Sequence, residues 1–208
     1  METTTHSDIK QIIKDSLTKS MSYAEYRTLV STLVESNSNT GNEVTEALAN
    51  YTMLNDRRMK RWDKTVKIDE GITDSIKSKT LNQTWVIITE SWCGDAAHVM
   101  PVINKIASLN EGISFRVVLR DQNELLMDQF LTNGSRSIAK LIIVDNASEE
   151  VIATYGPRPT TATALVNDYK AKHGGLTPEF KEELQKWYNK DKGQTVIADL
   201  VPLLGLKK

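Results

Sequence analysis

The chain has 208 residues, of which 39% are hydrophobic and 25% are charged, and its mean hydropathy is −0.38. This composition is typical of a globular domain, and 26 basic against 27 acidic side chains leave a net charge of −1, which argues against a nucleic-acid partner. Because the sequence contains one cysteine, no disulfide can form within the chain.

The sequence has no pattern of export or membrane insertion. Its first residues lack the basic segment and apolar run of a signal peptide. No uncharged apolar stretch approaches the ~18 residues that a membrane-spanning helix needs. We therefore expect a cytoplasmic protein without a membrane partner.

Periodic apolar residues predict three helices before residue 65. These helices are expected at about 7–17, 23–36 and 43–62. In the third helix, the residues expected to face inward are Val44, Leu48, Tyr51 and Leu54. Four bases at 57–61 are read as a solvated helix end that complements the helix dipole, in preference to an anion site.

From residue 65 onward, short apolar runs alternate with helical patterns. Strands are predicted at 66–68, 85–89, 113–119, 140–145 and 151–155, and helices at 69–79, 94–109, 123–131 and 160–173. Strands joined by helices start a sheet in parallel, and the final hairpin adds an antiparallel pair. The sequence thus predicts an α/β domain with a central mixed sheet.

Further helices are expected at 178–189 and at 196–204, the latter only as far as Pro202. We divide the chain into a helical N-terminal extension (1–64), an α/β domain (65–173) and a helical C-terminal extension (174–208). The apolar faces of the extensions are expected to pack on the domain, and a homodimer surface is the alternative.

The cysteine lies where a buried strand ends and a helix begins. The run Trp85–Thr89 is rich in β-branched residues, and a helical apolar pattern follows Gly94. Free N–H groups and the positive end of a helix favour a thiolate at Cys93, which is the reactive form of cysteine. The alternative is that Cys93 is a small buried apolar residue.

This segment resembles the active site of the thioredoxin superfamily. That family carries Trp-Cys-Gly-Pro-Cys after a buried strand, where this chain has Trp-Cys-Gly-Asp-Ala at 92–96. The family also has a helix-kinking proline, which Pro101 matches. The resemblance covers about 72–173 and implies a thioredoxin-like fold, with a central sheet flanked by helices.

The chain departs from the family pattern at several positions. Ala96 replaces the second cysteine, so no thiol within the chain can resolve a mixed disulfide at Cys93. Ala139 replaces a cis-proline, and since a cis bond before a non-proline residue costs ~2.5–4 kcal/mol, we predict a trans bond between Ile138 and Ala139. Ile87 stands where the family often has a buried acid. Asp95 is either a plain acid of the first helical turn or a polar partner for a ligand of Cys93.

The resemblance makes Cys93 the candidate catalytic residue. The candidate substrate-binding residues are Trp92, Gly94, Asp95, Ile138, Ala139 and Gly156. His98 follows Cys93 by five residues, which is about 500° around a helix, so no Cys–His pair is expected. Arg120 and Arg136 are expected near the site. Three scattered histidines and one cysteine have no ligand spacing, so we expect no metal, and we expect no cofactor.

Two functions remain open from the sequence. In the first, Cys93 works as a monothiol thiol-disulfide oxidoreductase, and protein thiols or a small thiol such as glutathione resolve the mixed disulfide. In the second, the protein is a non-catalytic binding module that has kept the scaffold. The sequence alone does not decide whether the protein is an enzyme.

Overall fold

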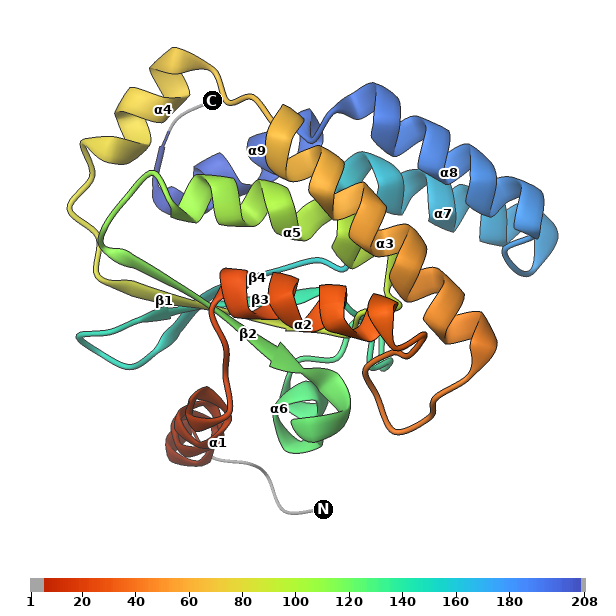
Figure 1. Ribbon diagram of the computed structural model, residues 1–208. Helices are drawn as coiled ribbons and strands as arrows, with labels where there is room; N and C mark the ends of the chain where they lie inside the picture. The colour runs from red at the N-terminus through yellow and green to blue at the C-terminus, as the bar shows by residue number, and fades with distance from the viewer. Residues whose placement is uncertain (1–5, 207–208) are drawn as a thin grey trace.

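The computed structural model describes residues 6–206 and contains one mixed sheet among them (Figure 1). Its four strands are β1 (Gln83–Thr89), β2 (Ile113–Leu119), β3 (Lys140–Asp145) and β4 (Val151–Tyr155). The strand order is β2-β1-β3-β4. β1 pairs in parallel with β2 and antiparallel with β3, and β3 pairs antiparallel with β4. The predicted parallel start and final hairpin are therefore confirmed.

The brief strand predicted at 66–68 is wrong. Val66 is the C-terminal cap of α3 (Glu46–Thr65), and its N–H donates to the carbonyl oxygen of Trp62. The next helix, α4 (Glu70–Lys77), is already capped by Asp69. Val66 is buried against the core without pairing to any strand of the described sheet.

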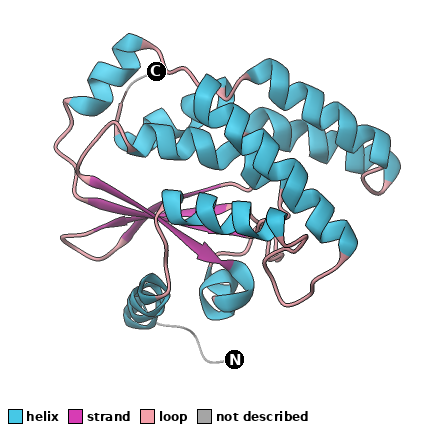
Figure 2. Cartoon of the chain, in the orientation of Figure 1, coloured by secondary structure: helices cyan, strands magenta, loops and turns pink. Residues whose placement is uncertain are grey.

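Helices enclose the sheet on both faces (Figure 2). Figure 1 shows α5 (Gly94–Ala107) on one side of the sheet, with α3 and the C-terminal helices, and shows α1 and α6 on the other side. The bounds of these helices are His6–Thr18 for α1, Glu124–Gln129 for α6, Thr160–His173 for α7, Pro178–Asp191 for α8 and Gln194–Leu200 for α9, which continues as a 3-10 turn at Val201–Leu204. No helix within 6–206 is long and apolar enough to cross a membrane.

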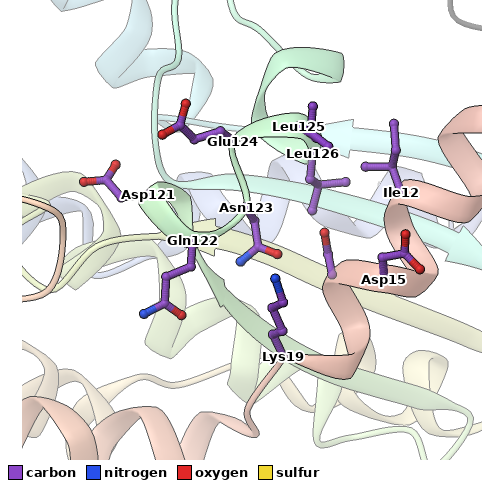
Figure 3. A pocket seen from close by; sticks show the side chains of 10 residues that line it. Ile12, Asp15, Lys19, Asp121, Gln122, Asn123, Glu124, Leu125 and Leu126 are labelled. Atoms are coloured by element: carbon purple, nitrogen blue, oxygen red, sulfur yellow. The ribbon is translucent and has the colours of Figure 1, made fainter.

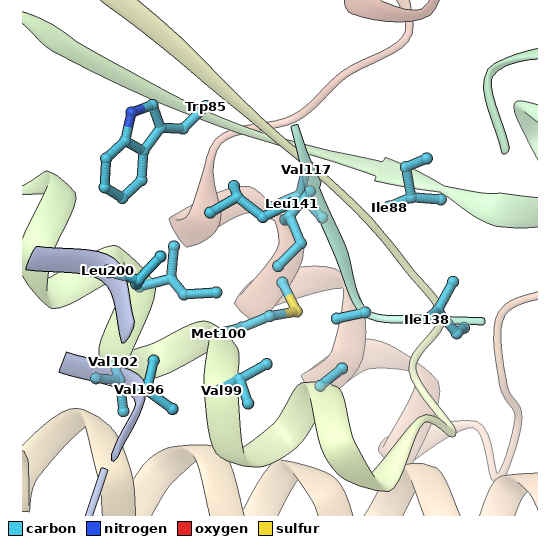
Figure 4. Packing of buried hydrophobic residues seen from close by; sticks show 14 of the residues in the cluster. Trp85, Ile88, Val99, Met100, Val102, Val117, Ile138, Leu141, Val196 and Leu200 are labelled. Carbon is cyan, nitrogen blue, oxygen red and sulfur yellow. The ribbon is translucent and has the colours of Figure 1, made fainter. Parts of the chain in front are cut away.

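The core lies between the sheet and α5. Figure 4 shows Met100 pointing from α5 toward Leu141 of β3, with Val102 beside Val196 of α9. Met100 and Leu141 are fully buried. The largest fully buried side chain, Trp85 of β1, donates a hydrogen bond to Gln83 Oε1 at 3.0 Å, so its one polar atom is satisfied.

Helices α2 (Tyr23–Glu35) and α3 begin at the caps that their sequences provide. Ser22 accepts from the N–H of Glu25, whose carboxylate in turn accepts from the N–H of Ser22. Thr45 caps α3 in the same way, by accepting from the N–H of Leu48.

The inward face predicted for the third helix is wrong. Val44, Tyr51 and Leu54 are 63%, 44% and 40% exposed. The helix instead buries a face that includes Thr52 and Asn55. This face packs on the turn after β1, whose backbone polar groups need hydrogen-bond partners, so polar residues of α3 point inward.

The helical segments before 65 and after 174 pack on this domain. The predicted boundaries lie close to helix ends, since α3 ends at Thr65 and α7 ends at His173. The description of these segments as extensions outside an α/β domain stays a prediction. Residues 1–5 and 207–208 of the predicted extensions lie outside the described part of the chain.

Candidate functional site

The turn between β1 and α5 places Cys93 at the N-terminal end of α5, as the sequence predicts. Cys93 is the N-cap residue, with φ −73° and ψ 111°. Its N–H donates to the carbonyl oxygen of Glu90 at 3.1 Å, and its Sγ accepts from the N–H of Ala96 at 3.4 Å. The first free N–H groups of the helix therefore point at the sulfur.

The thiol is buried and holds its proton, so the thiolate favoured at Cys93 by the sequence pattern is wrong, and the alternative of a buried cysteine holds. Cys93 is 7% exposed, and its Sγ–H donates to the carbonyl oxygen of Ile138 at 3.3 Å. Burial, followed by the nearby negative charge of Asp95, raises the pKa of the thiol to about 12. The helix N–H groups and Arg158 oppose this rise but are outweighed, because removing the thiolate from water is the larger cost.

Asp95 belongs to a buried polar cluster. Its Oδ2 pairs with Arg158 Nη2 at 2.6 Å, and its Oδ1 accepts from Tyr188 Oη at 2.9 Å. Burial raises the pKa of Asp95, and the charge of Arg158 opposes that rise. Arg158 thus lies against a carboxylate, and little of its charge is left to stabilise a thiolate.

The bond between Ile138 and Ala139 is cis, so the predicted trans bond is wrong. The prediction weighed only the intrinsic preference of the peptide bond for trans. Ala139 is 1% exposed, and its carbonyl oxygen lies 2.3 Å from where a Cβ on Gly156 would be. Gly156 has φ +102°, so only glycine fits this contact and this backbone conformation.

An open cavity of about 660 Å³ lies beside the thiol. Its walls come from α3, the β1–α5 turn, the loops at 136–138 and 157–158, and α8. The predicted site residues that line it are Trp92, Cys93, Gly94, Asp95 and Ile138. Ala139 and Gly156 are not among its lining residues; the carbonyl oxygen of Ala139 lies close to Gly156.

A family model named Thioredoxin_9 and described as thioredoxin matches residues 41–170. The chain belongs to this thioredoxin family. Two solved structures share the fold at 14% sequence identity, each over 89% of this chain and 98% of the other. They are PA1234 from Pseudomonas aeruginosa, a protein of unknown function (TM-score 0.57), and an HIV epitope scaffold (TM-score 0.55). No curated protein matches the chain.

Among thioredoxin-family sites, this one lacks a resolving thiol, because the position of the second cysteine is Ala96. The two arginines expected near the site do line the cavity. Arg120 lies over the ring of Trp92 at 5.0 Å and pairs with Asp121, and Arg136 pairs with Glu124 and Asp128. The cation that acts on the pKa of Cys93 is Arg158 instead.

His98 points away from the thiol, in agreement with its helical spacing. Its Nδ1 accepts from Trp62 Nε1 at 2.9 Å, and its Nε2 lies 2.6 Å from Gln185 Oε1. The ring stacks on Tyr188 with centroids 4.2 Å apart. Burial lowers the pKa of His98 to about 4, so the ring is neutral. No cluster of metal-ligating side chains occurs in the described chain.

Sequence reasoning missed two groups of site residues. Arg158, in the link between the last strand and α7, was not among the predicted site residues, and Tyr188 is 93 residues from its partner Asp95. Glu90, fully buried, accepts from the N–H of Asp121 at 2.9 Å, and burial raises its pKa. The one sequence signal was an acid directly after the apolar strand, two residues before Trp92.

The loop before α3 is bound to the site turn. Thr40 N–H donates to Ser91 Oγ at 2.9 Å, and Ser91 N–H donates to Thr40 Oγ1 at 2.7 Å. Trp92 Nε1 donates to the carbonyl oxygen of Thr40 at 3.1 Å. These contacts hold the Trp92 ring as one wall of the cavity.

A smaller cavity of about 320 Å³ lies between α1 and the 3-10 turn Arg120–Gln122 that precedes α6 (Figure 3). Asp15 of α1 and Lys19, directly after that helix, line it from one side, and Asn123 and Leu126 from the other. Its lining residues do not include the thiol or any of the predicted site residues, so the larger cavity is the candidate functional site.

Proposed function

We propose that the protein is a thioredoxin-fold binding module in which Cys93 is a structural thiol and the adjacent cavity receives the ligand. One observation carries this proposal: the Cys93 Sγ–H donates to the carbonyl oxygen of Ile138 from a buried position. A thiol in this state is not a nucleophile near neutral pH, because the thiolate is the reactive form. The resemblance to the family implies that a substrate peptide would dock on the backbone of Ile138. Here the Cys93 thiol already forms a hydrogen bond with the carbonyl oxygen of that residue.

The test is the reactivity of the single cysteine toward iodoacetamide. We expect native protein at pH 7 to react at least about 100-fold more slowly than protein unfolded in guanidinium, because a pKa of about 12 leaves very little thiolate. Since Cys93 is the only cysteine, every alkylated molecule reports on this site. A native rate equal to that of the unfolded chain, or a thiol titrating below about 8.5, would contradict the proposal.

A monothiol oxidoreductase is the second candidate, and one observation favours it. Cys93 lines the cavity, and the N–H of Ala96 at the α5 N-terminus donates to its sulfur. In this reaction, the Cys93 thiolate attacks a glutathionylated protein thiol, which forms Cys93–S–S–glutathione and releases the protein thiolate. A second glutathione thiolate then releases oxidised glutathione and restores the Cys93 thiolate. The net reaction consumes one free glutathione, which leaves in oxidised glutathione together with the glutathionyl group removed from the protein thiol.

This second candidate predicts turnover that depends on the sulfur. Reduction of a glutathionylated protein with excess glutathione would be faster with this protein than without it, and Cys93→Ser would abolish the increase. We expect instead that neither the protein nor Cys93→Ser changes the rate.

A further inference from the structure

The outer face of α3 leaves apolar side chains exposed where they border the cavity. Leu48 and Tyr51 line it, and Tyr51 is 44% exposed. Val44, just before the Thr45 cap of α3, is 63% exposed. Apolar side chains gathered beside a cavity indicate a surface that contacts a partner.

The cavity is also rich in positive charge. Its lining cations are Arg58, Arg120, Arg136, Arg158 and Lys181, and its lining acids are Asp95 and Glu182. Three of the arginines already have carboxylate partners, as described above. Glu182 pairs with Lys186, which lies outside the cavity lining.

Arg58 differs from the other three arginines. Its Nη1 donates to the amide oxygen of Asn55 at 2.8 Å, and no carboxylate among the described side chains pairs with it. Partial burial, chiefly, lowers its pKa. A guanidinium held partly out of water without a counter-charge is costly, and a carboxylate from a ligand would offset that cost.

Arg58 lies beside the start of α5. Its Nη1 is 3.7 Å from where a Cβ on Gly94, the first residue of α5, would be. The positive end of the α5 dipole adds to the attraction for an anion there. Along α3, the exposed Tyr51 precedes Arg58 by two helical turns, so one helix presents an apolar contact and then a charged one.

We propose that the cavity binds a peptide segment carrying an acidic side chain near an apolar one, with the carboxylate on Arg58 and the apolar side chain on Leu48 and Tyr51. This inference rests on the proposed function, because it names the ligand class of the same cavity. A small anion such as phosphate would leave the apolar wall uncovered. A basic peptide would place its cations against Arg58, which pairs with no carboxylate among the described residues.

The test is fluorescence anisotropy with labelled hexapeptides. The probes are alternating leucine and glutamate, alternating leucine and lysine, and alternating serine and glutamate. We expect the leucine–glutamate peptide to bind at least about tenfold more tightly than the other two, and to weaken as salt is raised. Equal binding of the lysine peptide or the serine peptide would overturn the proposal, as would no binding of the leucine–glutamate peptide at millimolar concentration.

Matched charge reversals on α3 locate the site. Arg58→Glu is expected to weaken binding of the leucine–glutamate peptide by about tenfold or more. Arg57→Glu makes the same charge change at a neighbouring exposed residue that does not line the cavity, and should leave binding within about twofold. Equal losses in the two variants would overturn the assignment to the cavity. Unchanged circular dichroism and melting temperature confirm that both variants are folded.

The two proposals fail in different ways. A reactive Cys93 with intact peptide binding would overturn the structural role of the thiol and leave the ligand class standing. An inert Cys93 with no binding of the leucine–glutamate peptide would overturn the ligand class alone.

Discussion

The phenol of Tyr188 donates a hydrogen bond of 2.9 Å to Oδ1 of Asp95, two residues beyond the only cysteine. Tyr188 belongs to α8, which lies outside the segment matched by the thioredoxin family model. The neighbouring Gln185 contacts His98 on the same face of α5. A C-terminal helix thus completes the polar surroundings of the cysteine.

Removing this phenol should destabilise the protein. Tyr188→Phe leaves a buried carboxylate with one fewer donor, so we expect the free energy of unfolding in urea to fall by about 1–3 kcal/mol. Tyr51→Phe is the control, because Tyr51 is exposed on α3, and its expected change is within about 0.5 kcal/mol. Similar losses in the two variants would show that the Tyr188–Asp95 hydrogen bond adds no stability.

Neutralising Asp95 should lower the pKa of Cys93. The negative charge of Asp95 disfavours the thiolate, so Asp95→Asn removes one cause of the raised pKa and leaves Arg158 without its partner. We expect a fall of about 1, to a value still above that of a free thiol, because burial remains the larger cause. Thiolate absorbance against pH measures it, and Asp128→Asn, an exposed acid paired with Arg136, should not move it. A rise in the Asp95→Asn variant would contradict this reading.

Stability should depend on pH through His98. Its pKa is lowered from 6.5 to about 4 in the folded protein, so between these values the unfolded chain binds more protons. The contribution of His98 is therefore fully present above pH 6.5 and is lost as pH falls toward 4, by about 3 kcal/mol in total.

The difference between variants isolates this effect. Asp95 and Glu90 have raised pKa values, so their contributions to the free energy of unfolding change with pH in the opposite direction over part of this range. The pH dependence of the parent protein's stability therefore does not by itself identify the contribution of His98. At each pH, the free energy of unfolding of His98→Gln is subtracted from that of the parent protein. We expect this difference to fall as the pH is lowered from 6.5 to about 4. His173→Gln, on the exposed end of α7, should show no such difference. Identical pH profiles for His98→Gln and the parent would refute the assignment.

A methyl group at Gly156 should be poorly tolerated. A Cβ there would lie 2.3 Å from the carbonyl oxygen of Ala139, and the backbone has φ +102°. We expect Gly156→Ala to lower the free energy of unfolding by roughly 2–4 kcal/mol. Gly134 also has positive φ but nothing within 4 Å, so Gly134→Ala should cost only about 1 kcal/mol. Equal costs would mean that backbone conformation, and not the contact with Ala139, makes glycine necessary at 156.

The sequence by itself determined the strands β2, β3 and β4, helix α7 and the position of Cys93 at the junction of β1 and α5. Each of these follows from apolar periodicity and chain-breaking residues within a short window, and the structure has the same bounds for the first four. The strand predicted at 66–68 is wrong because two apolar residues in a short link have the same local pattern as a strand. The local pattern does not specify whether a partner strand lies beside them.

Only the tertiary structure decided the state of the thiol and the nature of the cavity. Whether Cys93 is exposed depends on Ile138, 45 residues away. The charge on Asp95 is balanced by Arg158, 63 residues beyond it, and its carboxylate accepts a hydrogen bond from Tyr188, 93 residues beyond it. Likewise, the apolar pattern predicts that Tyr51 faces the core. In the structure, Thr52 and Asn55 face inward instead, because they form hydrogen bonds with Ser91 in the β1–α5 turn. Burial and charge balance are properties of neighbours in space, and the pattern of nearby residues in the chain does not specify them.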